Sequence, residues 1–191
     1  MARRPADAVA PIRRSIAVSW SPEAAFRRFT AEFATWWPRY TNSIGGPRVT
    51  RVVFEPRVGG LIYEEHADGT RFLWGRVTVF DSPRRVAFTF HATRAESDAQ
   101  DVDVVFTPEG SGTRVDLVSR GWEKMSPAAG KAHGGYQMTW GLILASYAGR
   151  FSGARLLFLA MAAAIDITGQ RGTFIRHSLG RLPPPPGSDR R

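Results

Sequence analysis

One short stretch of the chain holds residues whose types could carry out acid–base chemistry. Its candidates are Glu64, Glu65, His66 and Arg76, which flank Tyr63 and Trp74. A buried carboxylate near an arginine could orient a ligand or exchange a proton with it. Residues alternate between the two faces of a strand, so half of these side chains should face solvent. A solvated charge or a structural ion pair is therefore the simpler interpretation. No catalytic residue is predicted, and Glu65 and Arg76 are kept as candidate ligand contacts.

Other kinds of active chemistry find no support in the sequence. The histidines fall in separate segments without the short spacings of metal ligands, and the chain has no cysteine. The segment GKAHGG lacks the spacing of a phosphate-binding loop, and no G-x-S-x-G nucleophile motif is present. No metal and no cofactor are expected.

The elements that would position these residues begin with a strand and a helical pair. Ile12, Ile16, Val18 and Trp20 recur at strand spacing. The Ser21-Pro22-Glu23 segment then predicts a helix start, because serine caps a helix and proline fits its first turn. Apolar residues follow at helical spacing as far as FATWWP, where the proline ends the segment.

A series of short strands is predicted between Arg48 and Arg120. Six alternating or apolar runs are separated by turn residues, mostly with hairpin-length links, which favours an antiparallel meander. The Asp68-Gly69 pair predicts a two-residue turn. That turn would set Tyr63 opposite Trp74 and Glu65 opposite Phe72, with both pairs on one face.

Within the run RFLWGRVTVF, the apolar residues that should face inward switch from even to odd positions. Phe72 and Trp74 share one parity, whereas Val77 and Val79 share the other. A β-bulge at Gly75 would explain this change and would curve the strand. Burial of both faces is the alternative.

The C-terminal part predicts a long helix followed by an extension. Tyr136, Trp140, Ile143, Leu144, Tyr147 and Phe151 form one apolar helical stripe. We expect a disordered arm over residues 1–10, one domain over 11–152, a helical extension over 153–180 and a disordered proline-rich tail over 181–191.

The order of these elements and several sequence pieces carry a family resemblance. The pieces are SPEAAFRRFT with FATWWP, EPRVGGLIYEE with DGTRFLWGRV, DSPRRVAFTF, VVFTPEGSGTRVDLVSRGWE, and YQMTWGLIL. Over residues 11–152 the chain resembles the SRPBCC, or START-like, superfamily. Within it, the chain is most similar to the subfamily that resembles the C-terminal domain of the heat-shock-protein-90 ATPase activator. The resemblance implies an α+β helix-grip fold, a curved antiparallel sheet wrapped around a long C-terminal helix with a central cavity.

The resemblance also implies a function, because such cavities bind lipids, sterols, polyketides, plant hormones and natural products. We expect a carrier, sensor or sequestering protein for a small hydrophobic or aromatic molecule. Rings would supply stacking and buried area, although any of them could be plain core. Trp36 and Trp37 would lie near the cavity entrance. The aromatic candidates are Trp36, Trp37, Tyr63, Phe72, Trp74, Phe88, Phe90, Phe106, Trp122, Tyr136 and Trp140.

Two other functions stay open at this point. One is a cyclase-like or hydrolase-like enzyme that acts on the same ligand. The other is a protein-interaction module that uses the aromatic entrance and the apolar segment 156–165, which could also form a homodimer. Chaperone activation is not expected, since only about eleven residues precede the first strand.

The charge distribution argues against nucleic acid as a partner. The net charge is +9, but residues 1–14 and 171–191 hold nine arginines against two aspartates, which leaves only +2 for the rest. That remainder has no clustered basic stripe. The longest apolar run has ten residues, too few to cross a bilayer, and the N-terminal residues lack a secretory signal. We therefore expect a cytoplasmic protein without membrane insertion.

Overall fold

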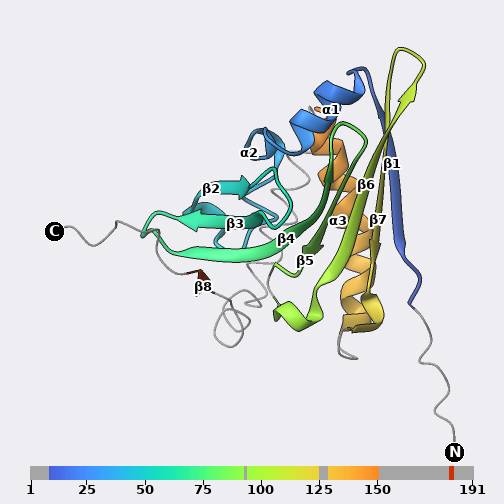
Figure 1. Ribbon diagram of the computed structural model, residues 1–191. Coiled ribbons are helices and arrows are strands. Elements are labelled where there is room, and N and C mark those ends of the chain that lie inside the picture. Colours follow the sequence, from blue (N-terminus) through green and yellow to red (C-terminus); the bar gives the residue numbers. More distant parts are fainter. Residues whose placement is uncertain (1–8, 93, 125–128, 151–180, 183–191) are drawn as a thin grey trace, which may run out of the picture.

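The fold begins with a strand that leads into two short helices. A computed structural model describes residues 9–92, 94–124, 129–150 and 181–182 (Figure 1). Its first elements are β1 (Ile12–Val18), α1 (Pro22–Phe29) and α2 (Phe33–Trp36). The predicted helix start is confirmed, because the Ser21 hydroxyl accepts a hydrogen bond from Ala24 N.

The six strands predicted between residues 48 and 120 are all present, and a long helix follows them. They are β2 (Val49–Phe54), β3 (Leu61–His66), β4 (Arg71–Asp81), β5 (Arg85–Phe90), β6 (Gln100–Glu109) and β7 (Gly112–Arg120). Single 3-10 turns lie at η1 (Gly46–Arg48), η2 (Glu96–Asp98) and η3 (Trp122–Lys124). The long helix is α3 (Ala129–Tyr147).

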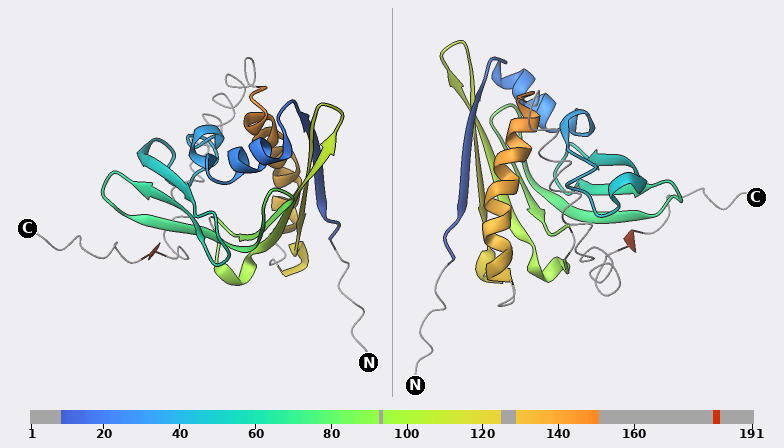
Figure 2. Two further views of the ribbon diagram at one scale, coloured as in Figure 1. Left: turned by 45° about the horizontal axis from the view of Figure 1, so that its top comes forward. Right: turned by 180° about the vertical axis from the view of Figure 1, so that it is seen from behind.

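The strands form one antiparallel sheet that curls around the helices. Its order is β1-β7-β6-β5-β4-β3-β2. On the concave side α3 packs on β1, α1 packs on β6 and β7, and α2 packs on β2. Figure 2 shows the curl from two further directions, with the three helices inside it. The chain therefore has the predicted α+β helix-grip fold.

β4 is the strand in which the sheet bends. Its register with β3 shifts between Ile62 and Tyr63, so that Trp74 is an extra residue in the ladder. At Gly75 a Cβ atom would lie 1.7 Å from the Thr89 carbonyl oxygen. Only glycine lets the two backbones approach so closely. The bulge predicted at this point is confirmed.

The turn between β3 and β4 differs from the prediction. Glu64 pairs with Phe72 and Glu65 pairs with Arg71, so the loop has three residues instead of two. Gly69 at its end adopts a φ of 77°, and the Asp68 carboxylate accepts a hydrogen bond from Thr70 N. The predicted pairs of Tyr63 with Trp74 and Glu65 with Phe72 were wrong, because this longer turn shifts the register by one residue.

The C-terminal segment contributes a short strand to the sheet. β8 (Arg181–Leu182) pairs with Arg71 and Phe72 of β4. Those two residues begin the tail that the sequence predicts as disordered. The remaining C-terminal residues of the helical extension and tail, with the homodimer proposed through them, lie outside the described residues and stay predictions.

Changing Gly75 to alanine should destabilise the protein strongly. The added methyl group must push β4 away from β5, and overpacking of this kind costs about 3 kcal/mol. Gly135 is a matched control, because it lies exposed in α3 and its Cβ would touch nothing. Gly135→Ala should raise the free energy of unfolding by about 1 kcal/mol. Urea denaturation measures both variants, and a Gly75→Ala protein as stable as the wild type would refute the tight crossing.

Candidate functional site

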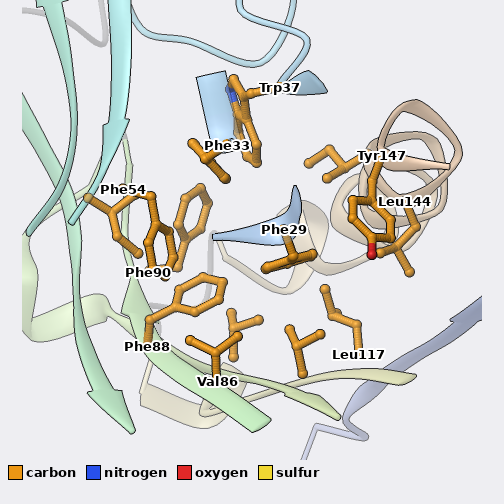
Figure 3. Packing of buried hydrophobic residues seen from close by; sticks show 14 of the residues in the cluster. Phe29, Phe33, Trp37, Phe54, Val86, Phe88, Phe90, Leu117, Leu144 and Tyr147 are labelled. Atoms are coloured by element: carbon orange, nitrogen blue, oxygen red, sulfur yellow. The ribbon is translucent and has the colours of Figure 1, made fainter. Parts of the chain in front are cut away.

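The space between the concave sheet and the helices holds one continuous aromatic core. Figure 3 shows rings from the sheet and from the helices converging on it. The ring of Phe33 stacks on Trp37 with centroids 4.9 Å apart, and Trp140 of α3 contacts Phe90 of β5 at 5.5 Å. Aromatic pairs at these separations are stabilising beyond their buried area.

The aromatic candidates from the sequence lie mostly inside this core. Tyr63 and Phe72 are also buried, and Tyr136 packs against the core while partly exposed. The members of the core cluster are Trp36, Trp37, Trp74, Phe88, Phe90, Phe106, Trp122 and Trp140. The structure therefore gathers these eight rings into one cluster, while Tyr63 and Phe72 are buried outside it.

The side chains of the adjacent residues Trp36 and Trp37 are both buried. Their exposed fractions are 4% and 6%, so neither indole stands open at an entrance. The Trp36 indole N–H donates to the Arg28 carbonyl, and that of Trp37 donates to the Asn42 carbonyl. Both polar atoms are satisfied within the chain.

The two charged candidates, Glu65 and Arg76, lie on the outside of the sheet. The Glu65 carboxylate pairs with Arg51 at 2.9 Å, and Arg76 is exposed and donates to the Gly59 carbonyl. Their side chains do not face the aromatic core. They make an ordinary surface ion pair and a loop contact.

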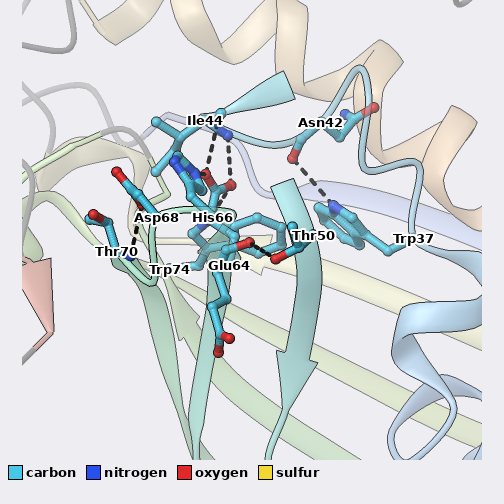
Figure 4. A network of polar contacts seen from close by, with 11 residues as sticks. Trp37, Asn42, Ile44, Thr50, Glu64, His66, Asp68, Thr70 and Trp74 are labelled. Atoms are coloured by element: carbon cyan, nitrogen blue, oxygen red, sulfur yellow. Dashed lines mark hydrogen bonds and ion pairs between the residues drawn. The ribbon is translucent and has the colours of Figure 1, made fainter. Parts of the chain in front are cut away.

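The inward carboxylate is that of Glu64, which is completely buried. It accepts hydrogen bonds from Ile44 N at 2.7 Å, Gly45 N at 2.8 Å, His66 Nε2 at 2.5 Å and Trp74 Nε1 at 3.2 Å (Figure 4). An ionised carboxylate only accepts, so His66 Nε2 carries a proton. Four donors compensate the loss of water around this charge.

Sequence reasoning underrated Glu64, although one signal pointed to it. Glu64 and His66 stand two residues apart on β3 and therefore share a face. Their partner Gly45 gave no such signal, because only the structure shows that a Cβ there would lie 2.3 Å from His66 Nε2. The loop glycine lets the backbone N–H groups reach the carboxylate.

Trp140 differs from the other buried tryptophans. Trp36, Trp37, Trp74 and Trp122 each donate the indole N–H to an acceptor within the chain. Trp140 is 1% exposed, and its Nε1 has no acceptor in the part of the chain that the structure describes. Buried polar atoms nearly always have a partner, so this one requires an explanation.

A second group of free polar atoms lies after β5. Arg94 donates through Nη1 to the Tyr136 hydroxyl at 2.8 Å, whereas its Nε and Nη2 are buried without a partner among the described residues. His91 is 3% exposed, and burial lowers the pKa of its imidazole, so the ring is neutral at pH 7. Its Nδ1 lies 3.0 Å from the Arg94 carbonyl oxygen, which can only accept. Nδ1 therefore carries the proton, and Nε2 presents a lone pair.

Over the described ranges, no three His, Asp or Glu side chains gather closely enough to hold a metal ion. Within the same residues, no helix combines the length and apolar character needed to span a membrane.

Comparisons with known proteins agree with the fold. The model of the family described as Activator of Hsp90 ATPase homolog 1-like protein matches residues 19–149. The anthrahydroquino-γ-pyrone synthase Txn09, solved in complex with SUM, is 31% identical, with a TM-score of 0.53. The match covers 76% of this chain and 99% of Txn09. None of the curated proteins compared with the chain matches it.

Two more distant structures show the same fold. The Aha1 dimer from Colwellia psychrerythraea is 20% identical with a TM-score of 0.51, and the match covers 72% of this chain and 92% of that one. Protein NE0264 from Nitrosomonas europaea is 18% identical with a TM-score of 0.54, covering 76% and 96% of the two chains.

Replacing Glu64 with glutamine should destabilise the protein by about 3 kcal/mol, because the amide removes the charge and turns a donor toward other donors. Glu65→Gln is the matched control on the same strand. Its carboxylate forms a solvent-exposed ion pair, so the loss should stay below about 1 kcal/mol. Guanidinium denaturation measures both. Equal losses of stability in the two variants would contradict the role of Glu64 as a buried anchor, the carboxylate that joins the loop at Gly45 to β3 and β4.

Proposed function

The chain belongs to the Activator of Hsp90 ATPase homolog 1-like family, within the SRPBCC superfamily, and we propose that it binds a small hydrophobic or aromatic molecule between the curled sheet and α3. The observation that carries this proposal is the unpartnered indole N–H of Trp140 on the aromatic inner face of α3. An oxygen of a bound molecule would supply the missing acceptor.

The surroundings of Trp140 favour a ligand built from fused rings. Its indole contacts the ring of Phe90, which in turn contacts Trp37 and Trp74. Rings surrounding a single free donor match the usual composition of small-molecule sites, in which apolar area supplies affinity and a few polar groups set orientation. A carrier, a sensor and a sequestering protein would all use such a site.

The comparison with Txn09 supports the same proposal. That protein is 31% identical over nearly its whole length, and its structure was solved with SUM bound. Identity of this order over a shared fold supports a bound small molecule in this chain as well.

An enzyme is the second candidate, because Txn09 is named as a synthase. The polar pair that faces the interior is Glu64 with His66, and Glu65 and Arg76 lie outside. Incubating the protein with a candidate ligand and analysing the mixture by mass spectrometry separates the two functions. A ligand recovered unchanged favours binding, and a new mass favours turnover.

Trp140→Phe should weaken binding of a neutral aromatic ketone. Anthraquinone-2-carboxamide is a suitable probe, since its ring carbonyls can accept the indole N–H and it carries no charge. The variant keeps a ring but loses the donor, so the Kd should rise about fivefold. Isothermal titration calorimetry measures the change.

Trp122→Phe is the matched control for stability. Both variants lose ring volume, but only Trp122 has an acceptor, the Ser119 carbonyl at 3.1 Å. Trp122→Phe should therefore lose about 1 kcal/mol more stability than Trp140→Phe. No binding of the probe by the wild-type protein, or an unchanged Kd in Trp140→Phe, would count against the proposal.

A further inference from the structure

Arg94 offers an unused pair of hydrogen-bond donors in a defined orientation. Its guanidinium lies over the Tyr136 ring, 5.0 Å from the ring centroid, and Nη1 donates to the Tyr136 hydroxyl. These contacts fix the plane of the group. The Nε–H and an Nη2–H, which run parallel on one edge of the guanidinium, have no partner among the described residues. That edge is the fork that receives both oxygens of a carboxylate.

The charge of Arg94 is also unbalanced. No acid forms an ion pair with it within the described part of the chain, and Glu96, two residues further on, is exposed. The hydroxyl of Tyr136 is neutral. A partly buried cation with two buried donors left free is costly unless an anion joins it.

Hydrogen bonds hold the backbone at His91, Ala92 and Arg94. Ala92 adopts a φ of 42°, an unfavourable conformation for a residue with a side chain. His91 N and Ala92 N both donate to the Trp74 carbonyl, and the His91 ring donates to the Arg94 carbonyl. The first two residues are therefore tied to β4, and Arg94 is tied to the His91 ring. Strain retained at one point of a pinned loop is a feature of binding sites.

The two free donor sites lie on one side of α3. Arg94 rests on Tyr136, and Trp140 follows Tyr136 by four residues, so the two rings share a helix face. The rise between them along the helix is about 6 Å. A fused aromatic acid of two or three rings can place a carboxylate on Arg94 and a carbonyl oxygen near the Trp140 N–H.

We infer that the bound molecule is an aromatic carboxylic acid, or an equally planar oxygen anion, whose two oxygens are held by the Nε and Nη2 of Arg94. This inference rests on the proposed function and adds the chemical class and orientation of the ligand. Arg94 sets specificity, while the aromatic core supplies most of the contact area.

A matched pair of probes tests the inference. Anthraquinone-2-carboxylic acid and its carboxamide share the rings and differ in charge. The wild-type protein should bind the acid at least about tenfold more tightly than the amide. Arg94→Gln should abolish that preference by weakening only the acid, and Arg94→Lys should restore part of it, since lysine keeps the charge without the fork.

Arg39→Gln is the control for a general loss of positive charge. Arg39 makes the same two contacts as Arg94, a hydrogen bond to the Tyr40 hydroxyl and a position over the Tyr40 ring, but at the surface. Arg39→Gln should leave the affinities for the acid and for the amide unchanged. Calorimetric titration of all four proteins gives the ratios, with circular dichroism to confirm folding.

The outcomes separate the inference from the function on which it rests. Equal affinity of the wild-type protein for acid and amide would overturn the assignment of Arg94 and leave the proposed function standing. Binding of neither probe would overturn both. If Arg94→Gln does not fold, the acid-to-amide ratio of the wild-type protein and of Arg94→Lys still decides the question.

Discussion

At Gly75 the backbone of β4 lies so close to that of β5 that no Cβ atom fits between them. The rest of the structure depends on this close approach and on the bulge at Trp74 beside it. The extra residue, Trp74, interrupts the ladder between β4 and β3 and bends the sheet into a concave surface. The bulge also directs the Trp74 indole to the Glu64 carboxylate. The Trp74 carbonyl accepts hydrogen bonds from His91 N and Ala92 N, which lie just before Arg94. One backbone feature thus sets the curvature, the buried anchor and the position of the free donors.

The interior contains polar groups of two kinds, and the contrast between them underlies the functional proposal. Glu64 is surrounded by four donors and needs nothing from outside the chain. Its role is structural, since it joins the loop at Gly45 to β3 and β4. By contrast, Trp140 Nε1 and the Nε and Nη2 of Arg94 have no acceptor among the described residues. Buried donors nearly always have an acceptor, and in the proposed function a bound molecule supplies it here.

The fold could be predicted from the sequence, because strand alternation, the Ser21-Pro22 helix start and the parity change at Gly75 are local signals. The site was harder, since it depends on register. One extra loop residue beside Gly69 exchanged the roles of neighbouring acids, placing Glu64 inside and Glu65 at the surface. Arg94 and His91 carried no pattern at all. Arg94 enters the proposal because two of its donors have no partner among the described residues, which only the assembled structure reveals.

The most direct measurement is the NMR signal of the tryptophan indole N–H groups during titration with anthraquinone-2-carboxylic acid. The chain has six tryptophans, and the Trp140→Phe variant assigns the relevant signal. An indole proton that gains an acceptor moves downfield. We expect the Trp140 signal to move in this way while that of Trp122, already bonded to Ser119, stays in place. Binding that leaves the Trp140 signal unmoved would contradict a ligand between the sheet and α3.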